Sequence, residues 1–153
     1  MSDGFDLVAL REEFLNTDYD EKSFHLEPRK LADYAIACGE QAECYTDPQN
    51  PDFQASPTFV SSLQSNRRLP EGFPKLPGLG MDAGKAVAPK KPIRPGAITA
   101  RTHLHDIYAK TGRSGKMTFL VTRMEIYDES GDQLATADTR VVIRERPPEE
   151  KSK

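Results

Sequence analysis

Tryptophan is absent from the 153 residues, and cysteine occurs only twice. Cys38 and Cys44 lack the spacing and the further partners that a zinc site or a thioredoxin-type motif requires. A disulfide between them is not expected in a reducing compartment, and free cysteine usually packs as a small apolar side chain. We therefore predict two buried or half-buried thiols and no metal site.

Long apolar runs and an excess of one charge are also missing. No stretch approaches the roughly 20 apolar residues of a membrane span, and the N-terminus lacks the basic-then-apolar order of a secretory signal. The formal charge is -3 and the basic residues are scattered, which argues against nucleic acid or an anionic membrane as partner. We expect a cytoplasmic protein with no membrane span.

Prolines and glycines are plentiful instead, and they divide the chain. Three prolines and four glycines fall within residues 67–84, too many for regular structure, so this stretch is predicted to be a loop. A loop of this length inside a compact domain is usually functional or mobile. Residues 85–91 are expected to form a strand, because the turn at 92–96 leads directly into the most regular part of the sequence.

That part is residues 97–146, where apolar and polar side chains alternate and two glycine-containing turns fall at 113–115 and 129–132. Period-2 alternation with tight turns predicts three antiparallel strands in a meander. On the last strand we expect Ala135, Ala137, Val141 and Ile143 to point inward, and Thr136, Asp138, Arg140 and Arg144 outward. His103 and His105 share a face at strand spacing, but with no third ligand nearby they are interpreted as surface histidines.

The first half of the chain favours helices. Residues 6–16 place Leu7, Leu10 and Phe14 on one stripe, with Ser2 or Asp3 as the N-cap. A brief strand is expected at 22–27, and a second helix from Pro28 to Gly39. A third, short helix is expected from residue 57 to near residue 66, with Phe59, Val60 and Leu63 facing inward.

Several short motifs occur in a characteristic order, although none is specific alone. They are Tyr34-Ala35-x-Ala37-x-Gly39-Glu40, Tyr45-x-Asp47, Ser56-Pro57-Thr58-Phe59, Pro92-Ile93-Arg94-Pro95-Gly96, Asp106-Ile107-Tyr108-x-Lys110, Gly115-x-Met117-Thr118-Phe119 and Asp132-Gln133-Leu134-Ala135-Thr136-Ala137. In this order they resemble the MaoC-like hot-dog dehydratases, and most closely their N-terminal-type dehydratase domain. The resemblance covers most of the chain from about residue 22 onward.

The resemblance implies an α+β hot-dog fold, in which a bent antiparallel sheet wraps around a central helix and two copies pair into a double hot dog. The expected organisation is an N-terminal helical extension at 1–20, the hot-dog domain at 21–147 and a charged tail at 148–153. Active members add water to a trans-2-enoyl thioester or remove it from an (R)-3-hydroxyacyl thioester. Coenzyme A or acyl carrier protein carries the acyl group, and no other cofactor is expected.

The catalytic positions depart from the family pattern Gly-Asp-x-Asn-Pro-x-His. Aligning on Gly39 places Glu40 at the Asp position and Tyr45 at the His position. Glu40 keeps a carboxylate, but its additional methylene moves the carboxylate oxygens by about a bond length. Catalytic geometry tolerates a displacement of only about 0.5 Å. A phenol with a pKa of about 10 is a poor base near neutral pH. The substitutions therefore favour a catalytically silent subunit.

The same resemblance implies a surface for the acyl thioester. Pro57, Thr58 and Phe59 are its expected contacts within the domain, and the loop at 67–84 is expected to border the ligand tunnel. Lys85 and Arg94 belong to a loose basic group that fits the phosphates of coenzyme A. The alternative interpretation is a solvated edge strand protected by charge.

Three functions stay open at this stage. The first is the silent partner of a heteromeric (R)-specific enoyl-CoA hydratase or 3-hydroxyacyl dehydratase, paired with a hot-dog subunit that carries Asp-x4-His. The second is a self-sufficient homodimeric hydratase that uses Glu40 as base and Tyr45 as proton donor or water anchor. The third is a hot dog that binds a thioester or another ligand without chemistry.

Overall fold

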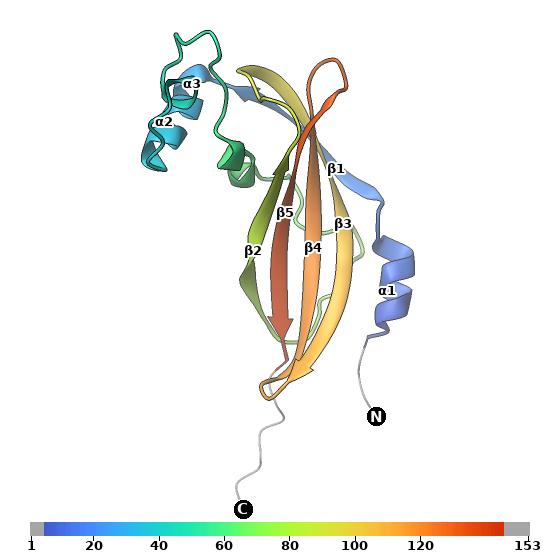
Figure 1. Ribbon diagram of the computed structural model, residues 1–153. Helices are drawn as coiled ribbons and strands as arrows, with labels where there is room; N and C mark the ends of the chain where they lie inside the picture. Colours follow the sequence, from blue (N-terminus) through green and yellow to red (C-terminus); the bar gives the residue numbers. More distant parts are fainter. Residues whose placement is uncertain (1–4, 146–153) are drawn as a thin grey trace, which may run out of the picture.

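The C-terminal third of the chain folds as the predicted meander. In the computed structural model, which describes residues 5–145, strands β3 (Gly96–Gly112), β4 (Gly115–Tyr127) and β5 (Gln133–Arg144) pair antiparallel in sequence. Figure 1 shows them as three long, curved strands. β3 is longer than the alternation predicted, because Gly112 and Gly115 still pair across the turn. In the second turn the Asp128 carboxylate accepts hydrogen bonds from the backbone N–H groups of Ser130 and Asp132.

Two further strands complete a five-stranded sheet with the order β1-β3-β4-β5-β2. β1 (Asp18–Leu26) pairs with β3, and β2 (Leu79–Pro89) pairs with β5, both antiparallel. β2 begins inside the stretch that the glycines and prolines predicted to be a loop, so that loop ends at Gly78. Gly84, with a φ of +105°, lies where the β2–β5 register shifts. This glycine therefore forms a bulge in a strand rather than interrupting it.

Helices lie at two borders of the sheet (Figure 1). α1 (Leu7–Phe14) lies beside β3, and its N-cap is Asp6, whose carboxylate accepts from the N–H groups of Val8 and Ala9. The predicted caps Ser2 and Asp3 lie outside the described residues. α2 (Pro28–Ala37) packs against the short α3 (Glu43–Thr46) and against η1 (Pro57–Ser62), which contacts β2 and β5.

The short helix after Pro57 is a 3₁₀ helix and ends earlier than predicted. The hydroxyls of Ser61 and Ser62 bind the carbonyls of Thr58 and Phe59, at 2.7 and 2.6 Å. Such local bonds compete with a continuing helix. Val60 is nevertheless fully buried against the sheet, as expected, and Phe59 and Leu63 pack against the same core.

The apolar core consists of two clusters on the inner face of the sheet. The first lies under α2 and η1 and includes Leu31, Val60, Met124, Ile126 and Ala137. The second lies under α1 and the loop before β2, and it comprises Leu10, Phe14, Leu76, Leu104, Ile107 and Leu120. The curved sheet and its few helices form the α+β fold that the resemblance implies. Among residues 5–145, no helix is long and apolar enough to cross a membrane.

The outer face of the sheet is less exposed than strict alternation predicts. Asp138, expected outward, is only 9% exposed, and His103, expected at the surface, is 8% exposed. On β5, Val142 is buried while Val141 is half-buried. Asp138 is covered by Arg123, which donates to both of its carboxylate oxygens, and His103 lies beside a register shift at Leu104–Asp106. Cys38 is exposed rather than buried, and Cys44 is intermediate.

The predicted division of the chain at residues 20 and 147 stays a prediction, and the tail at 148–153 lies outside the described residues. Residue 146, the predicted end of the last strand, lies there too.

Candidate functional site

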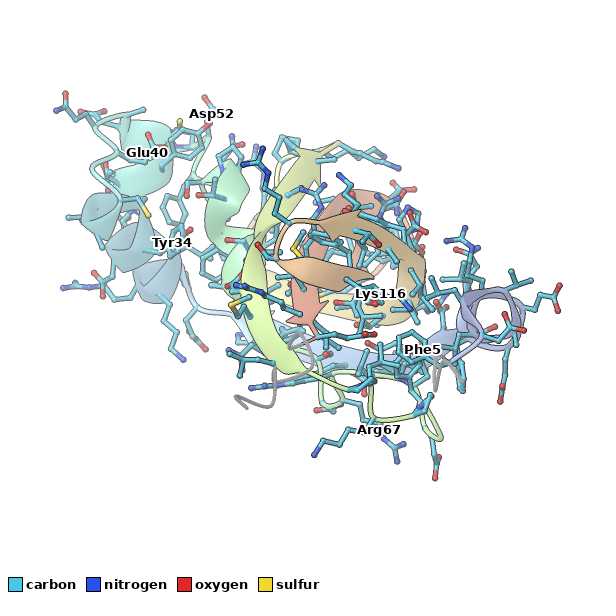
Figure 2. The ribbon with its side chains drawn as sticks, turned by 90° about the horizontal axis from the view of Figure 1, so that it is seen from below. Phe5, Tyr34, Glu40, Asp52, Arg67 and Lys116 are labelled. Carbon is cyan, nitrogen blue, oxygen red and sulfur yellow. The ribbon has the colours of Figure 1, made fainter. Side chains whose placement is uncertain are left out.

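The two degenerate catalytic positions lie on the lobe formed by α2 and α3. The chain leaves α2 through Gly39, which has a φ of +82°, and the Glu40 N–H donates to the Ala35 carbonyl at 3.0 Å. Tyr45 follows in α3, and both side chains are half-buried. Within the described residues, no hydrogen bond joins the Glu40 carboxylate to the Tyr45 hydroxyl. Figure 2 shows Glu40 and Tyr34 together on this side of the molecule.

Tyr34 connects the motif at residues 56–59 to this lobe through its hydroxyl and its ring. Its hydroxyl lies 3.1 Å from both the carbonyl oxygen and the side-chain oxygen of Thr58. Its ring meets the Phe59 ring edge-on, with centroids 5.3 Å apart. Pro57 and Thr58 are exposed, whereas Phe59 packs on the first core cluster. Tertiary structure thus joins two of the sequence motifs into one surface, and Tyr34 is the residue whose linking role the sequence did not reveal.

The two predicted phosphate contacts are both bound to backbone carbonyls. Lys85 on β2 donates from Nζ to the Ser61 carbonyl at 2.9 Å, which ties the edge strand to η1. Arg94 donates to the carbonyls of Phe53 and Pro51, at 3.1 and 3.3 Å. Lys85 therefore connects β2 to η1, and Arg94 holds the irregular segment that precedes η1. Lys85 also lines the cavity described next.

A cavity of about 690 Å³ lies on the inner face of the sheet, beneath the loop that precedes β2. This volume falls within the range of about 300–1,000 Å³ typical of small-molecule sites. The lining residues come from η1, the loop, β2 and the inner face of β3 to β5; among them are Val60, Leu63, Phe73, Leu76, Lys85, Leu120, Met124 and Ile143. The cavity lies between the two core clusters, because it is lined by members of both.

A second, more open and polar cavity of about 610 Å³ lies on the outer face. Strand register places Asp18, His103, Arg123 and Asp138 in one row across the sheet. Arg123 donates to both carboxylate oxygens of Asp138, at 2.7 and 2.9 Å. His103 Nδ1 lies 3.5 Å from the Asp18 carboxylate. Each carboxylate of this row therefore lies beside a basic side chain.

The two histidines of this cavity contact each other, which the prediction of two surface histidines did not include. His103 Nε2 lies 3.4 Å from His105 Nδ1. Burial, followed by the charge of Arg123, lowers the pKa of His105 from its ordinary value of 6.5. Within residues 5–145, no cluster of three or more histidine, cysteine or carboxylate side chains is arranged to hold a metal ion.

Comparison with known proteins identifies the family. Residues 13–137 match the family model described as FAS1-like, dehydratase domain region. The chain therefore belongs to this family of dehydratase domains. It is also 26% identical over 151 residues to a UPF0336 protein of Streptomyces avermitilis, an alignment that covers 90% of this chain and 97% of that relative.

Solved structures show the same fold. A MaoC-like dehydratase from Phytophthora capsici superposes with a TM-score of 0.65 at 22% identity, covering 87% of this chain and 49% of that one. This chain thus spans about half the length of the Phytophthora protein. The HadBC (3R-hydroxyacyl-ACP dehydratase) complex of Mycobacterium tuberculosis gives a TM-score of 0.58 at 16% identity, covering 84% and 99%. The hot-dog fold predicted from the motifs is confirmed.

Proposed function

We propose that this chain is the acyl-thioester-binding, non-catalytic subunit of a heteromeric (R)-specific enoyl-CoA hydratase or 3-hydroxyacyl dehydratase. The observation that carries the proposal is the cavity of about 690 Å³ on the inner face of the hot-dog sheet. The cavity is present although the Asp and His positions of the family pattern are occupied by Glu40 and Tyr45. A pocket without its water-handling pair is what a substrate-binding partner requires.

Hydration of an enoyl thioester needs a base that orients and deprotonates water, and an acid that protonates the α-carbon. Tyr45 is a poor base at neutral pH, because a phenol titrates near 10. Glu40 and Tyr45 also form no hydrogen bond with each other that would align them on one water. We therefore assign both roles to an Asp-x4-His pair on the partner subunit.

The partner is proposed to be a second hot-dog subunit, with a second copy of this chain as the alternative. β2 is an edge strand that pairs only with β5 within the described chain, and its side chains Leu79 and Met81 are exposed. An exposed edge strand with apolar side chains favours pairing with another strand. The similarity to a complex such as HadBC supports this arrangement at the level of the fold.

The proposed substrate is an acyl thioester of lipid metabolism in the cytoplasm, carried by coenzyme A or acyl carrier protein, with no further cofactor. Lys85, which lines the cavity near η1, is placed to meet the carrier phosphates if it exchanges its bond to the Ser61 carbonyl. Pro57, Thr58 and Phe59 form the adjoining surface on η1.

The test is hydration of a trans-2-enoyl-CoA by the purified chain, alone and mixed with a hot-dog subunit that carries Asp-x4-His. Activity only in the mixture supports the proposal. Activity of the chain alone that Glu40→Gln abolishes would establish the self-sufficient hydratase instead. Thioester binding without activity in either sample would leave a ligand-binding hot dog. The mass of the native complex from its own cells shows directly whether a second polypeptide is present.

A further inference from the structure

The two ends of the inner cavity differ in construction. On β5 the lining extends from Ala137, which pairs with Met124, to Ile143, six residues further along the strand. At a rise of about 3.3 Å per residue this corresponds to about 20 Å of strand. The end at Ala137 is formed by Val60 and Leu63 of the η1 region. The end at Ile143 is formed by the loop before β2.

The η1 end is the one near the degenerate catalytic positions. η1 is bound to α2 through Tyr34 and Thr58, and Glu40 lies three residues beyond the end of α2 at Ala37. Figure 2 places Glu40 and Tyr34 on one side of the molecule and Phe5, which precedes α1, on the opposite side. A thioester that enters at the η1 end, where Lys85 is proposed to meet the carrier phosphates, therefore extends its acyl chain away from the lobe, toward the loop and α1.

The loop end is lined by apolar side chains that contact α1. Phe73 and Leu76 line the cavity, and Leu76 is only 5% exposed. The Phe73 ring meets the Phe14 ring of α1 at a centroid distance of 5.1 Å and an interplanar angle of 65°. Phe14 packs in the second core cluster but does not line the cavity. Phe14 therefore supports Phe73 from behind.

We propose that Phe73 and Leu76, held in position by Phe14 of α1, close the far end of the acyl cavity and set the longest acyl chain that the subunit accepts. This inference rests on the proposed function, because it takes the cavity to be an acyl site. Phe73 and Leu76 act as specificity-determining residues that touch the end of the chain. Phe14 is a positioning residue that acts through Phe73.

The experiment measures binding of S-acyl-pantetheine thioesters of increasing length, from butanoyl to hexadecanoyl, to the full chain. Pantetheine is the part that coenzyme A and acyl carrier protein share, so the result does not depend on the carrier. For the wild type, affinity rises with chain length and then falls at a limiting length. The shortest acyl chain that the wild type rejects should bind to Phe73→Ala roughly tenfold tighter than to the wild type. This is the effect of burying about two additional methylenes.

Two further variants keep the inference testable if Phe73→Ala fails to fold. Phe73→Trp enlarges the side chain at the far end of the cavity and shifts the limiting length to a shorter acyl chain. Phe14→Ala removes the ring that holds Phe73 in position, so affinity falls less sharply beyond the limiting chain length. Affinity for butanoyl-pantetheine stays unchanged, since a short acyl chain does not reach this end. Phe5→Ala is the matched control, because Phe5 packs on the same cluster without lining the cavity, and it leaves the length profile as in the wild type.

The outcomes separate the two proposals. If the wild type binds acyl thioesters but none of the Phe73 and Phe14 variants changes the limiting length, the length inference is wrong and the proposed function stands. If the wild type binds no acyl thioester of any length, both are overturned. Opposite shifts in Phe73→Ala and Phe73→Trp establish the inference.

Discussion

At the scale of single residues, the Arg123–Asp138 pair joins β4 and β5 on the outer face through two hydrogen bonds. Its two side chains are 29% and 11% exposed, and both carboxylate oxygens are bound. Removing one partner of a buried pair leaves an uncompensated charge, which costs more than the pair itself contributes. The sequence predicted that Asp138 points outward, so its burial against Arg123 is a property of the fold.

We expect Asp138→Ala to lower the free energy of unfolding by about 2 kcal/mol, below the value for fully buried pairs because Arg123 reaches solvent. Urea unfolding measures the loss. Asp33→Ala is the matched control, since the Arg29–Asp33 pair is 86% and 60% exposed and such pairs contribute less than about 1 kcal/mol. Equal losses in the two variants would show that Asp138 is not effectively buried.

A second residue-scale prediction concerns His105. Its pKa is lowered by burial and by Arg123; His103 acts in the same direction, while Asp138 and Asp106 oppose the shift. The unfolded chain therefore takes up a proton at a higher pH than the folded one. Stability is complete above the ordinary histidine pKa and decreases as the pH falls below it.

His105→Gln removes this contribution. Between about pH 7.5 and about pH 5.5, one unit either side of the ordinary value, the urea midpoint of the wild type should fall more than that of His105→Gln. Groups common to both proteins cancel in the comparison. A parallel pH dependence in the two proteins would contradict the assignment.

At the scale of elements, the start of β2 depends on Gly78. Its φ is +126°, and a Cβ there would lie 2.7 Å from the carbonyl carbon of Arg144 and closer still to its oxygen. Leu79 pairs with Arg144 at the end of β5, so β2 and β5 approach too closely for a side chain at this point. Gly72, in the same loop, has a φ of +78° but open space around it.

Gly78→Ala should therefore lower the free energy of unfolding considerably more than Gly72→Ala does. The conformational cost of a positive φ is about 1–2 kcal/mol and applies to both, whereas only Gly78→Ala must also move the β5 backbone. We expect an additional loss of more than about 2 kcal/mol in urea unfolding, the range of substitutions that force backbone strain. A loss no greater than that of Gly72→Ala would mean that the end of β5 moves freely.

At the scale of the whole molecule, the proposed pairing with a second hot-dog subunit can be tested at the edge strand β2. Leu79 and Met81 are 57% and 40% exposed on this strand. Lysine on an edge strand prevents pairing with another strand. The double variant Leu79→Lys and Met81→Lys should therefore shift the native assembly to single chains without unfolding them.

Light scattering and native mass determination measure that shift. Val8→Lys is the matched control, because Val8 is 63% exposed on α1, away from β2, and it should leave the assembly intact. An assembly that survives the double variant would place the contact on another surface.

The local elements follow from the sequence by itself. Alternation and glycine turns predicted β3 to β5, and the stripe of Leu10 and Phe14 predicted α1, because each pattern reports which face of one element is buried. The order of short motifs predicted the hot-dog fold, and aligning on Gly39 marked Glu40 and Tyr45 as the changed positions.

Only the tertiary structure decided what lies between the elements. β2 forms from a glycine-rich stretch because β5 supplies its hydrogen-bond partners from residues far along the chain. The Arg123–Asp138 pair joins two strands, and the Tyr34–Thr58 contact joins two helices. The burial of His103 likewise depends on residues from neighbouring strands. The cavity exists because the loop before β2 spans two core clusters, and no periodicity within one segment encodes the space between several.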